Sequence, residues 1–89
     1  MQDFLPRRYM KADKLKEKLL KGSVKNWSFA DACLLARHCG WSLTRTNGSH
    51  HIFTHEKTAI ASLNLQEEES EAKAYQLRQM KKLIEDFDL

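Results

Sequence analysis

The chain has 89 residues, of which 42% are hydrophobic and 30% are charged. This length suits one domain, and this composition excludes an intrinsically disordered chain and a coiled coil. Residues 1–27 hold eight basic and three acidic side chains, whereas residues 65–89 hold four basic and seven acidic ones. The basic half could lie along nucleic-acid phosphates, although an ordinary solvated surface has the same pattern.

Neither export nor membrane insertion is predicted. Residues 1–9 lack the apolar core of a signal peptide, and no run approaches the roughly 18 apolar residues of a membrane span. Cys33 and Cys39 are the two cysteines, and both fall in one predicted helix. About 9 Å of axial rise separates them, which is too far for a disulfide. Two free thiols indicate a reducing cytoplasm.

The N-terminal part is predicted to be an irregular arm followed by a short helix. Residues 1–12 show no clear apolar period and form the arm. Asp13 is expected to cap a helix that ends near Leu20, with Gly22 just beyond it. The folded domain is therefore expected to span residues 13–89.

A second helix has the clearest boundaries. Ser28 stands at the N-cap position and Asp31 follows three residues later, as in a carboxylate variant of the capping box. Gly40 is expected to end the helix in a left-handed conformation. One apolar stripe recurs at three- and four-residue spacing along it, formed by Phe29, Ala32, Cys33 and Ala36.

The period then changes to two, which indicates strands. Residues 41–46 and 49–55 are predicted to form a hairpin around Asn47 and Gly48, and residues 58–65 to contain a third strand. Residues 66–72 are acidic and polar, and are expected to be a solvated connection. A last helix begins near residue 73, with an apolar stripe of Leu77, Met80, Ile84 and Phe87.

This order predicts an α+β fold, α-α-β-β-β-α, in which a three-stranded antiparallel meander packs on helices. The hairpin register decides which histidine faces water. A two-residue loop pairs His50 with Arg45 and buries Ile52. A three-residue loop pairs His50 with Thr44, buries Phe53 and leaves His50 on the outer face. Burying Phe53 rather than Thr54 favours the second register by about 2 kcal/mol.

Four histidines fall between residues 38 and 55. A zinc site is not predicted, because about 13 Å of strand separates His51 from His55 and no zinc-binding spacing of cysteines or histidines occurs. A nucleophilic Ser49 activated by His50 is also disfavoured, because adjacent strand residues point to opposite faces. Exposed polar residues without catalytic function would look the same.

Acid–base chemistry on RNA suits this segment better. Cleaving RNA requires a proton to be taken from a 2′-hydroxyl and one to be given to the leaving oxygen, and histidine can do both near neutral pH. No metal is required if cationic side chains neutralise the phosphate. Arg45 and Lys57 are the cations nearest to the histidines in sequence.

Residues 40–53, which read Gly-Trp-Ser-Leu-Thr-Arg-Thr-Asn-Gly-Ser-His-His-Ile-Phe, resemble the HicA family of toxins from bacterial type II toxin–antitoxin systems. Residues 63–66 (Leu-Asn-Leu-Gln) and 72–79 (Ala-Lys-Ala-Tyr-Gln-Leu-Arg-Gln) are similar to one branch of that family. The resemblance runs from about residue 13 to the C-terminus.

The resemblance implies a fold like the double-stranded-RNA-binding domain and an endoribonuclease that acts on mRNA (an mRNA interferase) without a cofactor. It also implies a HicB-type antitoxin as partner. The family's catalytic histidine maps to His50, with His51 as the second candidate. Residues expected to contact RNA are Gly48, Ser49, Arg45, Lys57 and Lys73. The alternatives are a non-catalytic RNA-binding module of the same fold and a protein-interaction domain.

Overall fold

The computed structural model describes residues 7–89, with side chains from residue 11 onward. The elements in chain order are α1 (Arg7–Leu20), α2 (Phe29–His38), β1 (Trp41–Asn47), β2 (His50–His55), β3 (Leu63–Glu68), β4 (Glu71–Ala72) and α3 (Ala74–Phe87). The strands form one antiparallel sheet in the order β1-β2-β3-β4. The α+β class is confirmed, but the sheet has four strands rather than the predicted three.

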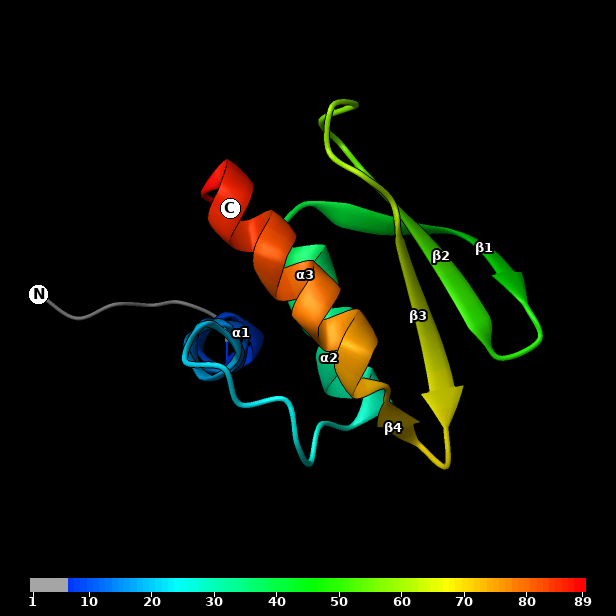
Figure 1. Cartoon of the computed structure of the whole chain (residues 1–89), viewed down its shortest axis with the longest axis horizontal. Helices are drawn as coiled ribbons and strands as arrows, with labels where there is room; N and C mark the ends of the chain where they lie inside the picture. The colour runs from blue at the N-terminus through cyan, green and yellow to red at the C-terminus, as the bar shows by residue number, and fades with distance from the viewer. Residues whose placement is uncertain (1–6) are drawn as a thin grey trace, which may run out of the picture.

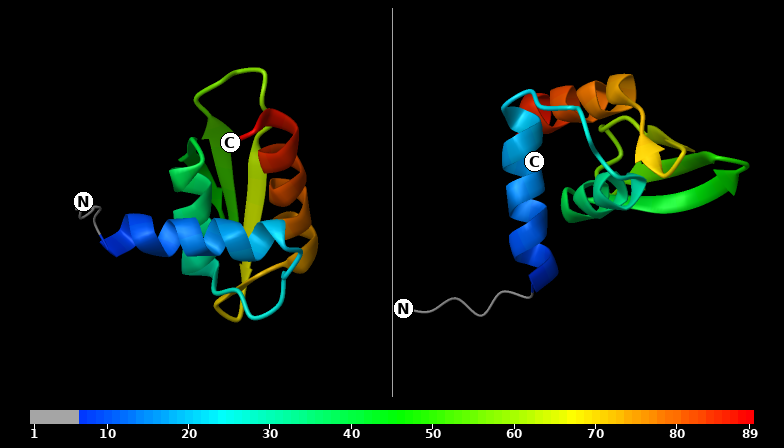
Figure 2. Two further views of the ribbon diagram at one scale, coloured as in Figure 1. Left: turned by 90° about the vertical axis from the view of Figure 1, so that its left-hand side faces the viewer. Right: turned by 90° about the horizontal axis from the view of Figure 1, so that it is seen from below.

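The elements are stacked in three layers. Helices α2 and α3 both lie on one face of the sheet (Figure 1), with strands visible between them (Figure 2, left). Helix α1 crosses these two helices on the side away from the sheet (Figure 2). Within residues 7–89, no helix covers the other face of the sheet, which we call the outer face.

One hydrophobic core fills the space between the layers. Its largest fully buried side chains are Trp27, Trp41, Phe53, Leu19, Leu35, Leu63, Leu65, Leu77, Met80 and Ile84. Fully burying one such aliphatic or aromatic side chain stabilises the fold by about 1.5–3 kcal/mol. The predicted apolar stripe of α2 is buried as expected, and its members Ala32 and Ala36 have no exposed surface.

Both ends of α2 have the predicted signals. The hydroxyl of Ser28 accepts a hydrogen bond from the backbone N–H of Asp31 at 3.0 Å, which satisfies a donor that the first turn leaves unpaired. At the other end Gly40 has a φ of +105°, in the left-handed region. The chain therefore leaves the helix and enters β1 within two residues.

The predicted start of the first helix is wrong. Helix α1 begins at Arg7 and not at Asp13, so the predicted irregular arm is helical over residues 7–12, while residues 1–6 lie outside the described residues. Ala12 explains the difference, because it is 1% exposed and extends the buried stripe of Leu15 and Leu19 by one turn. An alanine is a weak signal of a buried face.

The predicted solvated connection at residues 66–72 is also wrong, because this segment is a hairpin between β3 and β4. Glu69 and Ser70 have φ values of +52° and +69°, the pattern of a type I′ turn. The usual signal for this turn is a glycine, and the sequence has none here. The N–H of Phe29 donates to the Ser70 carbonyl at 2.9 Å, and the N–H of Ala72 donates to the Trp27 carbonyl at 3.1 Å.

His55 is a structural residue that joins α2 to the sheet. It is 3% exposed, and its ring meets the Trp41 ring edge-on with centroids 4.7 Å apart. Its Nδ1 accepts from the backbone N–H of Lys57 at 2.9 Å, so Nε2 carries the proton and donates to the Cys39 carbonyl at 2.8 Å. Both ring nitrogens are thus satisfied inside the fold.

Gly40 lies directly against this histidine, so Gly40→Ala should destabilise the protein. A Cβ at position 40 would lie 2.6 Å from Nε2 of His55, and the positive φ adds strain. We expect a loss of about 3 kcal/mol or more in the free energy of unfolding, measured by urea denaturation.

Gly22→Ala is the matched control. Gly22 also has a positive φ, +91°, but a Cβ there would meet nothing within 4 Å. It should cost only the conformational strain of about 1–2 kcal/mol. Equal losses in the two variants would show that contact with His55 does not matter.

Candidate functional site

The outer face of the sheet is polar and accessible. On β2 and β3 the side chains alternate, with Phe53, Leu63 and Leu65 buried toward the helices. The alternate positions therefore face outward. The outer face of the three long strands carries Ser42, Thr44, Arg45, Asn47, His50, Ile52, Thr54, Asn64, Gln66 and Glu68.

The hairpin that carries the histidines has neither of the two predicted registers. His50 is paired with Asn47, not with Arg45 or Thr44. The turn is made by Gly48 and Ser49, and Gly48 has a φ of +62°, which fits a type II′ turn with glycine first. The loop is therefore displaced by one residue from the Asn-Gly pair that predicted it.

A bulge in β1 restores the buried pairing at the base of the hairpin. The register shifts between Leu43 and Arg45, so Thr44 is the extra residue. Its hydroxyl donates to the Ile52 carbonyl at 3.1 Å and lies 3.1 Å from the hydroxyl oxygen of Thr54. Thr44 and Arg45 consequently both face outward. The expectation that Phe53 is buried and His50 faces outward is correct, although the pairing that led to it is wrong.

His50 is exposed at the tip end of β2, between Asn47 of β1 and Gln66 of β3. Its Nδ1 lies 3.3 Å from Oδ1 of Asn64. Arg45 is its diagonal neighbour on β1, at a separation that a long side chain can span. The site thus combines one imidazole, one guanidinium and several neutral amides on an open surface.

His51 lies on the opposite face of the sheet. Its ring packs on Phe29 at the start of α2, with centroids 4.7 Å apart and an angle of 60° between the ring planes. Its Nδ1–H donates to the Ser49 carbonyl at 3.1 Å. The structure does not bring His50 and His51 into one site.

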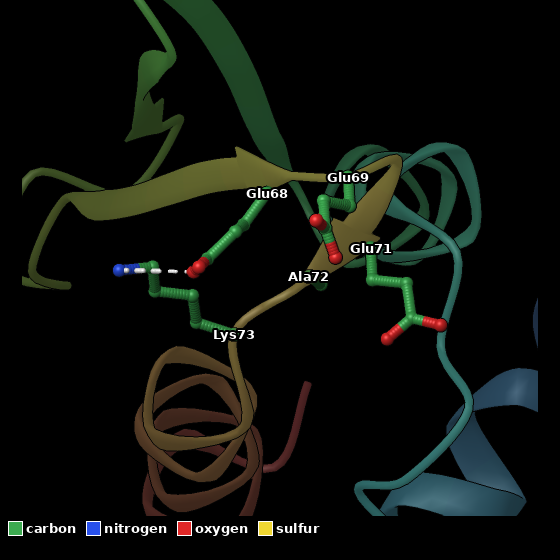
Figure 3. Close-up of a pocket in the computed structure, with 5 residues that line it drawn as sticks. All are labelled: Glu68, Glu69, Glu71, Ala72 and Lys73. Atoms are coloured by element: carbon green, nitrogen blue, oxygen red, sulfur yellow. Dashed lines mark ion pairs between the residues drawn. The ribbon is translucent and has the colours of Figure 1, made fainter.

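The two predicted lysines lie outside the three long strands. Lys57 follows the far end of β2, where its backbone N–H bonds to His55. Lys73 precedes α3, and its Nζ lies 3.4 Å from a carboxylate oxygen of Glu68 (Figure 3). A shallow pocket beside this ion pair is also lined by Glu69 and Glu71, so its walls are mainly acidic and would repel phosphate.

The cysteines are placed away from the outer face. Both thiols are free and buried, and burial raises the pKa of Cys33 and of Cys39 above the ordinary thiol value. Arg37 near Cys33 and Lys16 near Cys39 lower the pKa in part. Within the part of the chain that the structure describes, no three His, Cys, Asp or Glu side chains lie close enough to hold a metal ion.

Comparison with known protein families gives a clear match. The family model described as the HicA toxin of bacterial toxin–antitoxin matches residues 29–86, more than half of the 89-residue chain. The chain belongs to the HicA toxin family. The match to HicA runs from α2 into α3 and includes the whole sheet, while α1 precedes it. No curated protein and no solved structure gives a significant match.

Membership of the HicA family means that the protein is a toxin with an antitoxin as its partner. None of the helices in residues 7–89 is long and apolar enough to cross a membrane.

Asn64 is the site residue that sequence reasoning did not select. Its position between two leucines in Leu63-Asn64-Leu65 was a usable signal, because alternation with buried residues places it on the outer face.

The buried thiols predict slow alkylation of the native protein. Because burial raises the pKa of both groups, the reactive thiolate is scarce at pH 7, and it becomes more abundant as pH rises. We expect both cysteines to react at least about tenfold faster in 6 M urea than in the folded state. Mass spectrometry after timed exposure to iodoacetamide measures this, and rapid native labelling would contradict the buried placement.

Proposed function

We propose that this HicA toxin is an endoribonuclease that cleaves mRNA, with His50 as its acid–base group. The observation that carries the proposal is the placement of His50. Of the four histidines, all within the described residues, His50 is the exposed one. It faces outward from the uncovered side of the sheet, where an extended RNA strand can reach it.

The proton transfers require no group beyond the imidazole and the RNA itself. His50 takes the proton from a 2′-hydroxyl as the 2′-oxygen forms a bond to phosphorus. The bond from phosphorus to the 5′-oxygen breaks, and the imidazolium returns the proton to that oxygen. The products are a 2′,3′-cyclic phosphate and a 5′-hydroxyl, so protons and bonds balance.

Arg45 is the cation best placed to hold the scissile phosphate. The bulge at Thr44 turns it to the same face as His50, and a guanidinium can contact two phosphate oxygens at once. Gly48 and Ser49 form the turn next to this site, and a Cβ at position 48 would meet nothing within 4 Å. This open space supports close approach of an RNA backbone. Lys57 would contact a more distant phosphate, whereas Lys73 could do so only by leaving its ion pair with Glu68.

We infer that the antitoxin is of the HicB type and covers the outer face. A partner seated there would block both His50 and Arg45, which would neutralise the toxin without unfolding it.

The proposed mRNA substrate and the two free thiols support a location in the reducing cytoplasm.

His50→Ala should abolish toxicity and RNA cleavage. Acid–base catalysis by one side chain contributes about 10²–10⁴-fold, so we expect the cleavage rate to fall at least 100-fold. Growth after induction and the decay of an end-labelled RNA with purified protein measure the two effects. Because the side chain is exposed, thermal stability should stay unchanged.

His51→Ala is the matched control, since the neighbouring imidazole lies on the other face. It should retain most of the cleavage activity of its folded fraction. If both variants remain fully toxic, the proposed mechanism is wrong. If wild-type protein binds RNA in a salt-dependent way and leaves it intact for hours, the protein is a non-catalytic RNA-binding module instead.

Arg45→Ala should weaken RNA cleavage more than Lys57→Ala. Each variant removes one positive charge from an exposed position, so overall charge is matched. We expect a loss in kcat/KM of roughly tenfold for Arg45→Ala and of about twofold for Lys57→Ala. Equal losses would indicate that only net charge matters and that Arg45 is not at the scissile phosphate.

A further inference from the structure

The hydrogen bond between His50 and Asn64 defines the state of the imidazole. Nδ1 of His50 and Oδ1 of Asn64 are 3.3 Å apart. An amide oxygen can only accept, so the proton of this bond belongs to Nδ1. In the neutral ring Nε2 then carries a lone pair and no proton, which is the form a general base requires.

The fold holds Asn64 where its amide oxygen can accept the hydrogen bond from Nδ1 of His50. Its neighbours Leu63 and Leu65 are 1% and 0% exposed, so burial of both fixes the amide on the outer face. The backbone is locked as well, because Asn64 pairs with Ile52 and the next outward residue, Gln66, pairs with His50. The amide is thus a diagonal neighbour of the imidazole, within reach of it.

No charged side chain near His50 competes with Asn64 for the hydrogen bond to the ring. By strand alternation two charged side chains share the outer face with His50, Arg45 on β1 and Glu68 on β3. Glu68, further along β3, is engaged with Lys73, and His51 lies on the opposite face. Among the described residues that flank His50 on β1 and β3, no carboxylate is hydrogen-bonded to the ring.

We propose that Asn64 is a positioning residue that holds His50 in the tautomer with the proton on Nδ1, so that Nε2 faces the RNA as the base. This inference rests on the proposed function of His50, and it adds which nitrogen reacts and what keeps it available. During RNA cleavage, Nε2 accepts the 2′-hydroxyl proton and later releases it to the 5′-oxygen. Nδ1–H stays bonded to Asn64 throughout and stabilises the transient imidazolium.

The tautomer can be measured without any reaction. Long-range ¹H–¹⁵N NMR spectra of the folded protein, at a pH where the ring is neutral, distinguish protonated from unprotonated ring nitrogens. We expect the proton on Nδ1 in the wild type and a redistribution toward Nε2 in Asn64→Val, which keeps a strand-forming residue but has no acceptor. Gln66→Val is the matched control, because it removes an amide beside His50 that makes no bond to the ring, and it should leave the tautomer unchanged.

Kinetics supply the second measurement. Asn64→Val should lower kcat by roughly three- to tenfold with little change in KM, which is the factor that one net hydrogen bond supports. Asn64→Asp keeps an acceptor and should restore most of kcat. Its negative charge favours the protonated ring, so the acid limb of the pH–rate profile should move up by as much as about one pH unit.

The outcomes separate this inference from the proposed function. A proton on Nε2 in the wild type, or identical tautomers in wild type and Asn64→Val, would overturn the role of Asn64 even if the protein cleaves RNA. A KM effect with unchanged kcat and pH profile would do the same, because it would make Asn64 a substrate contact. An inactive wild type would instead refute the proposed function, and the NMR result would still decide the tautomer.

Discussion

The burial of Phe53 between the sheet and the helices is the constraint on which the rest of the site depends. Phe53 has no exposed surface, and its cross-strand neighbour on β3, Leu63, is equally enclosed. Because side chains alternate along a strand, the burial of Phe53 determines which face of the sheet each of the remaining side chains of β2 lies on. His50 is three positions away and therefore faces water, whereas His51 faces α2. One hydrophobic contact thus selects which of two adjacent histidines can meet a large substrate.

Much of this could be predicted from the sequence, because the relevant signals are local. The cap at Ser28 and the left-handed Gly40 mark the ends of α2 through hydrogen bonds and steric constraints within a few residues. The preference for burying Phe53 rather than Thr54 identified the correct face for His50. The amphipathic stripe likewise placed Leu77, Met80 and Ile84 in the core, although its last member, Phe87, is 42% exposed.

The missed features depend on contacts between distant segments. Strand β4 is held by hydrogen bonds to Phe29 and Trp27, more than 40 positions earlier in the chain, which no local pattern of residues 66–72 reveals. The bulge at Thr44 also depends on both ends of the hairpin. With a Gly-Ser turn at one end, an extra residue is needed for Trp41 at the other end to face the core. Asn64 acquires its role only when β3 lies beside β2. The ion pair between Lys73 and Glu68 likewise forms only because the β3–β4 hairpin brings the start of α3 next to β3.

The bulge at Thr44 has a consequence for the edge of the sheet. β1 is an edge strand, and a regular edge strand offers a row of unpaired N–H and C=O groups to which another chain can add. An extra residue breaks the spacing of those groups and bends the strand, so a second copy cannot continue the sheet in register. The irregularity that turns Arg45 outward therefore also disfavours the addition of another strand at this edge.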